Sequence, residues 1–273
     1  MSADVYLIIG ENDWPKHEGV LAVDFPSLDS IGLRLKHDRT LEVHKSSGAW
    51  QRVKGVLWRG QYDLEFAKEH ALLCMIRAST SPCINNAECA FRYSDRISMF
   101  GAMQSIGLPT LPVTFFCRSA GLDTLSDSEL PCVIKVGNWH MGYGKMKCDT
   151  HSSRLDAVDM AHIAKDYVAI EPFIVYRRDI RILIVGDKHV AIEREPSQWK
   201  ANIHPKSMKV VDIPICIVEM SRALACKVGA AIIGVDWIQD SRDRWFVLEA
   251  NLSPGLNGSG VDLRPEAMAL LSS

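Results

Sequence analysis

Two acidic residues face one another in the last hairpin that the sequence predicts. Apolar runs at residues 232–240 and 245–251 flank a polar turn, which places Asp236 directly opposite Glu249. Asn251 follows two residues later on the same face. Opposed carboxylates repel unless a positive group lies between them, and oxygen ligands of this kind suit Mg²⁺ bound together with substrate phosphates. The sequence therefore predicts a metal site, with a solvated strand end that tolerates the repulsion as the alternative.

The register of this hairpin rests on its apolar residues. A turn centred between residues 242 and 243 places Trp237 opposite Leu248 and Val235 opposite Ala250. These apolar pairs make the register self-consistent, because a slip by one residue turns every side chain to the other face.

A glycine-rich loop between two predicted strands is the second feature that could carry chemistry. Gly137, Gly142 and Gly144 allow backbone amides to approach an anion closely, and Lys135 on the preceding strand adds a positive charge. The loop is not a P-loop, because Tyr143 stands where that motif requires lysine. The pattern indicates either a phosphate-binding loop or a hairpin connection that uses glycines for its turns.

The third feature combines acidic, basic and amide side chains. A two-residue turn at Gly186-Asp187 places Asp179 opposite Arg194, and Lys200 and Asn202 follow shortly after. These residues form either an edge that meets a transferred phosphate or a surface ion pair that contributes little to stability.

The elements that must position these residues differ between the two parts of the chain. Residues 1–95 alternate short strands with a helical stretch, which predicts a small α/β domain with a largely parallel sheet. The hairpin-rich part from residue 96 onward is predicted to contain helices over 95–106, 155–165 and 215–228, strands over 132–136, 145–148 and 168–173, and hairpins over 179–195 and 232–251.

Composition excludes several classes of protein. The chain has 273 residues, 47% of them hydrophobic, and a net charge of −2, which is typical of a globular protein. The near-neutral charge argues against a nucleic-acid-binding protein, and no apolar stretch approaches the length of a membrane span. Eight scattered cysteines without a C-x-x-C pair, and no signal peptide, predict a cytoplasmic protein with reduced thiols.

In their order and spacing, these residues resemble the ATP-grasp superfamily. The closest resemblance is to the RimK-type ligases, the group of the ribosomal-protein glutamate ligase and the lysine-biosynthesis carrier ligases. The stretches that carry it lie at residues 85–95, 111–114, 133–135, 171–174, 179–181 and 234–236 and in Leu248-Glu249-Ala250-Asn251-Leu252-Ser253-Pro254-Gly255-Leu256. The glycine loop and Trp199-Lys200-Ala201-Asn202 are also similar to the synapsins, which keep this fold as ATP-binding proteins.

The resemblance implies an α/β (α+β) fold in which two antiparallel sheets hold ATP between them. An N-terminal α/β domain over residues 1–95 would precede an ATP-grasp domain over residues 96–273. The latter would divide into a glycine-loop subdomain over 96–170 and a metal-binding subdomain over 171–273.

The resemblance also implies a role for each matching residue. Lys135 would contact the phosphates, Glu171 and Pro172 the adenine, and Asp179 the ribose. The complete nucleotide-binding set would be Arg96, Lys135, Gly142, Gly144, Glu171, Pro172, Asp179, Lys200, Ala201 and Asn202. The residues expected to act in catalysis are Arg194, Lys200 and Asn202. Asp236, Glu249 and Asn251 would hold two Mg²⁺ ions, with Mn²⁺ as an alternative metal.

The implied activity is ATP-dependent amide bond formation. ATP phosphorylates a carboxylate, and an amine of an amino acid or peptide then replaces the phosphate; a homo-oligomer is compatible with this activity. The alternative is a synapsin-like protein that binds ATP without turnover, but the synapsins depart from the metal set at the position of Asn251. Two departures from the ligases are Arg96, where they usually have lysine, and residues 203–207, where they have a basic, glycine-rich stretch.

Overall fold

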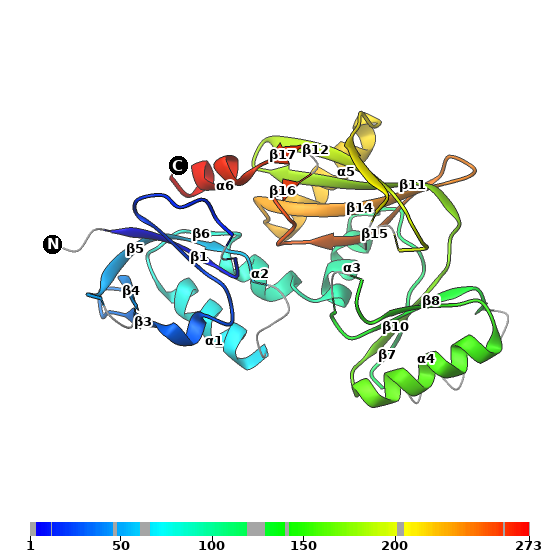
Figure 1. The fold of residues 1–273 in the computed structure, drawn as a ribbon, viewed down its shortest axis with the longest axis horizontal. Coiled ribbons are helices and arrows are strands. Elements are labelled where there is room, and N and C mark those ends of the chain that lie inside the picture. The colour runs from blue at the N-terminus through cyan, green and yellow to red at the C-terminus, as the bar shows by residue number, and fades with distance from the viewer. Residues whose placement is uncertain are drawn as a thin grey trace.

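A computed structural model describes residues 4–11, 13–45, 48–60, 66–118, 129–139, 142–200, 205–258 and 260–272 of the chain. An N-terminal sheet lies at one end of the molecule, and a five-stranded and a four-stranded sheet lie beside each other at the other end (Figure 1). No helix in these ranges is long and apolar enough to cross a membrane.

The N-terminal sheet has the strand order β2-β1-β5-β4-β3, with β6 paired to β5. Its parallel part consists of β1 (Val5–Ile9), β2 (Val20–Val23), β5 (Gln51–Trp58) and β6 (Cys83–Ile84). Two antiparallel strands, β3 (Ile31–Leu35) and β4 (Leu41–Lys45), form a hairpin that the sequence analysis did not predict. The 3-10 helix η1 (Leu28–Ser30) and the helices α1 (Phe66–Ala78) and α2 (Ala87–Tyr93) complete this part. The sheet therefore has the predicted parallel part, with an antiparallel hairpin at one edge.

The four-stranded sheet carries the glycine loop. Its order is β7-β10-β8-β9, all antiparallel, with bounds β7 (Thr114–Phe116), β8 (Cys132–Val136), β9 (Lys145–Cys148) and β10 (Val168–Pro172). Helix α4 (His151–Ala164) packs on one face through buried residues such as Ala157 and Ala161. It begins before the predicted residue 155, because the Thr150 and Ser153 side chains form a capping box.

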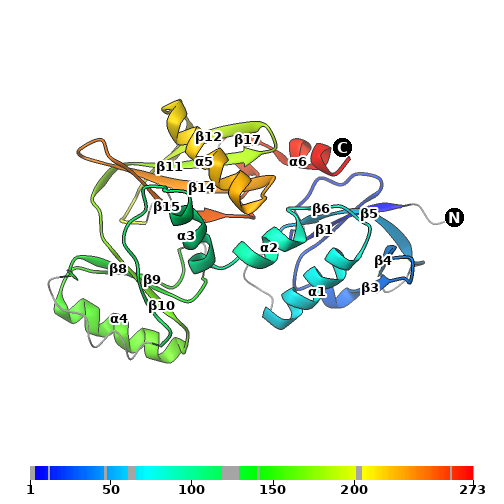
Figure 2. The ribbon, with the colours of Figure 1, turned by 180° about the vertical axis from the view of Figure 1, so that it is seen from behind.

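The five-stranded sheet has the order β13-β12-β11-β14-β15 and is also antiparallel. Its strands are β11 (Tyr176–Val185), β12 (Lys188–Glu195), β13 (Ser207–Val210), β14 (Ile232–Asp240) and β15 (Trp245–Asn251). Helices α3 (Arg96–Ser105) and α5 (Ile215–Val228) cover one face (Figure 2). The buried Trp237 lies in this core and donates a 2.9 Å hydrogen bond to Ser221. The opposite face is left for the site.

The carboxylate register predicted for β14 and β15 is confirmed, but the pairing nearer the turn is wrong. Asp236 pairs with Glu249, whereas Trp237 pairs with Val247 instead of Leu248. The pairs nearest the turn centre on residue 242 instead of between 242 and 243, and the Asp240 carboxylate accepts hydrogen bonds from two backbone N–H groups of the turn. A bulge at Leu248 then restores the expected register.

The C-terminal segment returns to the N-terminal sheet. After the short strands β16 (Asn257–Gly258) and β17 (Val261–Asp262), helix α6 (Arg264–Ser272) packs against β5 and β6 (Figure 1). Leu271 of this helix shares a buried cluster with Leu57 and Leu183, which come from the N-terminal and five-stranded sheets.

The Asn85 side chain joins these two sheets. Its amide nitrogen donates to the carbonyl oxygens of Ile232 and Leu252 at 2.6 and 2.9 Å, and its oxygen accepts from the Ile232 N–H at 2.7 Å. Asn85 is 1% exposed, so water cannot replace these hydrogen bonds. They fix the start of β14 and the segment that follows β15.

We expect Asn85→Ala to lower the free energy of unfolding by about 2–4 kcal/mol, because buried polar groups lose their partners. Denaturant unfolding measures this loss, and the exposed Asn257→Ala serves as the control. A loss for Asn85→Ala no larger than that of the control would contradict the structural role of this residue.

Candidate active site

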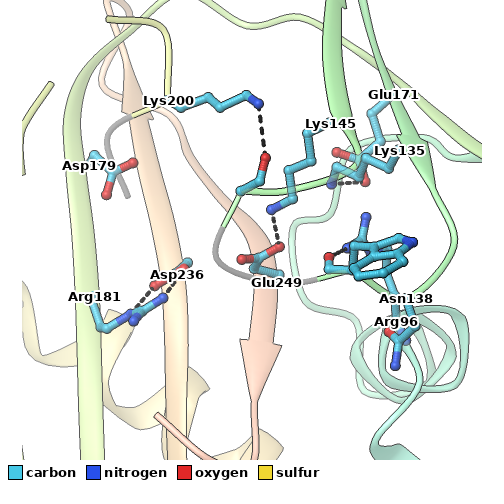
Figure 3. A network of polar contacts seen from close by, with 12 residues as sticks. Arg96, Lys135, Asn138, Lys145, Glu171, Asp179, Arg181, Lys200, Asp236 and Glu249 are labelled. Atoms are coloured by element: carbon cyan, nitrogen blue, oxygen red, sulfur yellow. Dashed lines mark hydrogen bonds and ion pairs between the residues drawn. The ribbon is translucent and has the colours of Figure 1, made fainter. Parts of the chain in front are cut away.

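A cleft between the four-stranded and five-stranded sheets collects most of the predicted site residues (Figure 3). The predicted residues that line it are Lys135, Glu171, Pro172, Asp179, Arg194, Lys200, Asp236 and Glu249. Arg96 and Asn251 line an adjoining pocket that shares Glu171 and Glu249 with the cleft. Ala201 and Asn202 lie outside the described residues. Lys145 and the apolar Phe173, Ile174 and Trp199 also line the cleft, although none of them was predicted as a site residue.

One face of the five-stranded sheet supplies the charged wall of the cleft. Arg181 on β11 pairs with Asp236 on β14, which pairs in turn with Glu249 on β15. Directly opposed residues share a face, so the three side chains form a row across three strands. The residues between them along each strand, such as Trp237, point to the other face of the sheet and into the core.

Asp236 is held by two arginines. Arg181 donates two hydrogen bonds of 2.7 Å to its two oxygens, and Arg194 lies 3.3 Å from Oδ1. Burial alone would raise the pKa of Asp236, which is 3% exposed, but the two guanidinium groups outweigh burial and lower it. This carboxylate is therefore ionised, as a ligand of a hard divalent cation must be. The sequence analysis gave Arg181 no role, although its alternation with Asp179 along one strand is a visible signal.

The predicted pairing of Asp179 with Arg194 is found, but not at the surface. The Arg194 Nε donates to Asp179 Oδ1 at 2.6 Å, and both residues are buried. Burial raises the pKa of Asp179 to about 6, against the opposing effect of Arg194. Of the two alternatives for this pair, the exposed surface ion pair is therefore excluded.

Glu249 pairs with a residue from the opposite wall. Lys145, the first residue of β9, places Nζ 2.7 Å from Glu249 Oε2 (Figure 3). Burial would raise the pKa of Glu249, but Lys145, Arg96 and Lys135 together hold it well below its ordinary value. Lys145 directly follows the last glycine of the loop, which is the signal that could have identified it.

Lys135 and Glu171 form a buried ion pair within the four-stranded sheet. They lie on the neighbouring strands β8 and β10 and point into the cleft (Figure 3). Burial lowers the pKa of Lys135, with Glu171 opposing it. The pair places a cation and a hydrogen-bond acceptor side by side at the cleft wall.

Two side chains from outside the glycine loop, Lys200 and Arg96, hydrogen-bond to its backbone. Lys200 Nζ donates to the Gly142 carbonyl oxygen at 2.9 Å, and burial together with nearby Lys145 lowers the pKa of Lys200. Arg96 donates from Nη2 to the Trp139 carbonyl oxygen at 2.6 Å, and its backbone N–H donates to Asn138. Arg96 therefore holds the start of the loop in this structure.

Gly144 is required by the geometry of the loop. It has a φ of +63°, and a Cβ atom there would lie 2.8 Å from the Val136 carbonyl oxygen. Only glycine fits this close approach without a backbone shift. Lys145, which follows it, is thereby directed across the cleft.

The donor set suits a hard divalent cation. Asp236 and Glu249 are opposed, and Asn251 lies two residues beyond Glu249 on the same strand. The described ranges contain no group of three or more His, Cys, Asp or Glu side chains that could hold a metal, so the amide oxygen would have to complete this set. Each carboxylate already faces a cationic side chain, which indicates that the site requires positive charge.

A further pocket adjoins the cleft beyond Arg194. It is lined by Arg181 and Arg194 and by apolar side chains that include Leu183, Ile192 and Leu256. Arg194 lines both this pocket and the cleft. An anionic group in the pocket would therefore lie beside the residues that could hold phosphate and metal.

Comparison with known proteins agrees with this geometry. The family described as "Synapsin, ATP binding domain" matches residues 79–221, which is more than half of the chain. A probable alpha-L-glutamate ligase of Mannheimia succiniciproducens is 28% identical over 220 residues, covering 74% of this chain and 71% of that protein. The ribosomal protein bS6–L-glutamate ligase of Escherichia fergusonii is 28% identical over 66% of this chain and 64% of its own length. The chain thus spans about two thirds of the length of these relatives.

Solved structures share the fold at low sequence identity. The macrocyclase MdnC of Microcystis aeruginosa, bound with its precursor peptide MdnA, has a TM-score of 0.73 at 13% identity and covers 100% of this chain and 99% of its own. D-alanyl-alanine synthetase A of Vibrio cholerae has a TM-score of 0.72 at 13% identity, covering 100% and 95%. These findings confirm the resemblance to the ATP-grasp superfamily and its RimK-type ligases, and the chain belongs to the family of the synapsin ATP-binding domain.

Proposed function

We propose that the chain is an ATP-dependent ligase that activates a carboxylate as an acyl phosphate and joins it to an amine. The single observation that carries this proposal is the row Arg181–Asp236–Glu249. This row lies between the cleft, which is lined by lysines, and the further pocket, which is lined by Arg181 and Arg194. ATP would bind in the cleft, and the carboxylate would enter from the pocket. The two reactants would then meet at Arg194, which lines both spaces.

The nucleotide would use the two walls of the cleft. Lys135, Lys145 and Lys200 converge on the space beneath the glycine loop and suit the phosphates. Asp179 would accept hydrogen bonds from the ribose, and Glu171 and Pro172 would contact the adenine. Arg96 supports the loop through Trp139, and this support is compatible with a further contact to phosphate.

Asp236, Glu249 and Asn251 would hold Mg²⁺. We propose two ions, with Mn²⁺ as an alternative, because Asp236 and Glu249 are opposed on one face of the sheet and Asn251 follows Glu249 on the same strand. A bound metal neutralises charge on the phosphate oxygens during transfer.

The chemistry requires two steps. A carboxylate oxygen attacks the γ-phosphorus, the bond to the β-phosphate oxygen breaks, and ADP leaves. The lone pair of the amine then attacks the acyl carbon, inorganic phosphate departs with the electrons of the C–O bond, and the amine loses a proton. Arg181 and Arg194 would stabilise the negative charge in both steps, and the loop would exclude water from the acyl phosphate.

The pocket lined by Arg181 and Arg194 favours an amino acid or peptide with an apolar group near its carboxylate. Its charged lining, in the described part of the chain, consists of Arg181 and Arg194, while Leu183, Ile192 and Leu256 form apolar walls. Such a pocket attracts an anion and an aliphatic side chain together.

A synapsin-like protein that binds ATP without turnover is the second candidate, because the matched family is that of the synapsin ATP-binding domain. The similarity to two glutamate ligases and the presence of Asn251 in the carboxylate set favour the enzyme. Acceptor-dependent release of ADP distinguishes the two candidates, because both bind ATP.

We also propose the domain boundaries, the location and the oligomeric state of the protein. We place the N-terminal domain at residues 1–95, the glycine-loop subdomain at 96–170 and the metal-binding subdomain at 171–273, with α6 returning to the first of them. The protein would act in the cytoplasm, as a monomer or as a homo-oligomer.

Incubation with Mg²⁺, ATP and pools of amino acids and short peptides tests the function directly. We expect release of ADP above background in at least one pool, together with a product whose mass equals the two substrates minus water. ATP binding without acceptor-dependent release of ADP in any pool would support the synapsin-like alternative and contradict the ligase proposal.

We expect Glu249→Gln and Asn251→Ala to lower turnover by at least about a hundredfold, because the metal loses an oxygen ligand. Circular dichroism and thermal unfolding verify that both variants remain folded. Glu193→Gln is the matched control, since Glu193 lies in the same sheet, on the opposite face, and pairs with Arg178 at 2.6 Å. Turnover retained in both site variants would show that the metal residues are wrongly assigned.

Nucleotide affinity should weaken as pH falls through about 6. Above this pH Asp179 is ionised and accepts from the ribose hydroxyls, whereas below it the raised pKa leaves the carboxyl protonated. Between pH 7.5 and pH 5 we expect the wild type to lose about tenfold in nucleotide affinity. This loss is in addition to whatever change the Asp179→Asn variant shows over the same range. Titration of the ATP phosphates affects both proteins equally, so identical pH profiles for the two would refute the role of Asp179.

A further inference from the structure

Lys145 bridges the two walls of the nucleotide cleft. It belongs to β9 of the four-stranded sheet, and Glu249 belongs to β15 of the five-stranded sheet. Their side chains are 11% and 19% exposed, and the N–O distance is 2.7 Å. The ion pair therefore occupies a carboxylate oxygen that is proposed to bind metal (Figure 3).

The cation beside Asp236 is arranged differently. Arg181 lies on β11, directly next to Asp236 on β14, and its guanidinium is fixed by two hydrogen bonds within one sheet. It can stay in place while the carboxylate binds a further cation. Lys145 reaches Glu249 only from across the cleft, at the end of a glycine-rich loop.

An ammonium group and a divalent cation compete for the same carboxylate oxygen. Two positive charges so close repel each other strongly in a cleft of low dielectric constant. If the metal takes Oε2 of Glu249, Lys145 must leave that oxygen, and a buried lysine without a partner is costly. Nucleotide phosphates beneath the loop would supply a new partner, because Lys145 begins directly after Gly144.

We propose that the Lys145 ammonium occupies the metal position at Glu249 in the nucleotide-free protein. When nucleotide binds, the divalent cation replaces the ammonium at this position. This inference rests on the proposed nucleotide and metal site. Lys145 passes from the carboxylate to the phosphates, and the metal takes the carboxylate. Metal then binds weakly to the free protein and tightly together with nucleotide, so the two ligands are coupled.

Mn²⁺ binding to the nucleotide-free protein tests this exchange. Electron paramagnetic resonance of free Mn²⁺ reports the affinity without any turnover. We expect Lys145→Gln to bind Mn²⁺ about tenfold more tightly than the wild type, because the competing ammonium is gone. We also expect its affinity for a non-hydrolysable ATP analogue to fall several-fold.

Two control variants separate charge from packing. Lys147→Gln removes the other described lysine of β9, which pairs with Asp149 at 2.9 Å and lies over the Phe173 ring, and it should leave Mn²⁺ affinity unchanged. Lys145→Arg retains the positive charge and should bind Mn²⁺ as weakly as the wild type. Thermal unfolding establishes that each variant is folded at the assay temperature.

The outcomes distinguish the exchange from the underlying site. An unchanged or weaker Mn²⁺ affinity in Lys145→Gln overturns the exchange, and so does a Lys145→Arg variant that binds as tightly as Lys145→Gln. Glu249→Gln tests the metal assignment itself in the presence of the ATP analogue. If this substitution leaves Mn²⁺ binding intact, the metal site is wrong and the exchange falls with it.

Discussion

The ionised state of Asp236 is the constraint on which the rest of the site depends. A carboxylate that is 3% exposed is stable only if its negative charge is compensated within the protein, and Arg181 and Arg194 provide this compensation. Both arginines reach it because β11, β12 and β14 are antiparallel neighbours in one fixed register. A shift of one residue in either pairing would turn the arginines toward the α5 side of the sheet.

The same principle extends across the cleft. Glu249 requires a cation as Asp236 does, and the partner available to it belongs to the other sheet. Charge compensation therefore connects the two walls, and Lys200 adds a second link through Gly142. The chain belongs to the family of the synapsin ATP-binding domain, and the lysines that bridge the cleft are groups that attract phosphates.

The N-terminal sheet contributes by fixing the segment that follows β15, the strand that carries Glu249 and Asn251. Asn85 binds the Leu252 carbonyl oxygen, and Arg59 donates to the Pro254 carbonyl oxygen at 2.6 Å and to Glu11 at 2.9 Å. These contacts tie the end of β15 to the loops of β1 and β5. The position of Asn251 thus depends on residues far away in the sequence.

Much of the cleft could be predicted from the sequence, because local patterns determine it. The turns of two hairpins place Asp179 opposite Arg194 and Asp236 opposite Glu249, and apolar alternation fixes which face they share. The bulge at Leu248 was not predictable from the pattern, because apolar alternation does not show where the pairing shifts by one residue. Contacts between distant elements, such as Lys145 with Glu249 and Asn85 with Ile232, leave no periodic signal. The β3–β4 hairpin was not predicted, although it was visible in the sequence, because Ile31, Leu33 and Leu35 on β3 and Leu41 and Val43 on β4 alternate with glycine or polar residues.

Transfer of oxygen from the carboxylate to phosphate tests the central claim most directly. With a carboxylate substrate labelled with ¹⁸O, mass spectrometry of the released phosphate reports which bond formed. Activation as an acyl phosphate predicts that one ¹⁸O atom appears in each inorganic phosphate. Unlabelled phosphate, or label recovered in AMP, would contradict phosphoryl transfer to the carboxylate in this cleft.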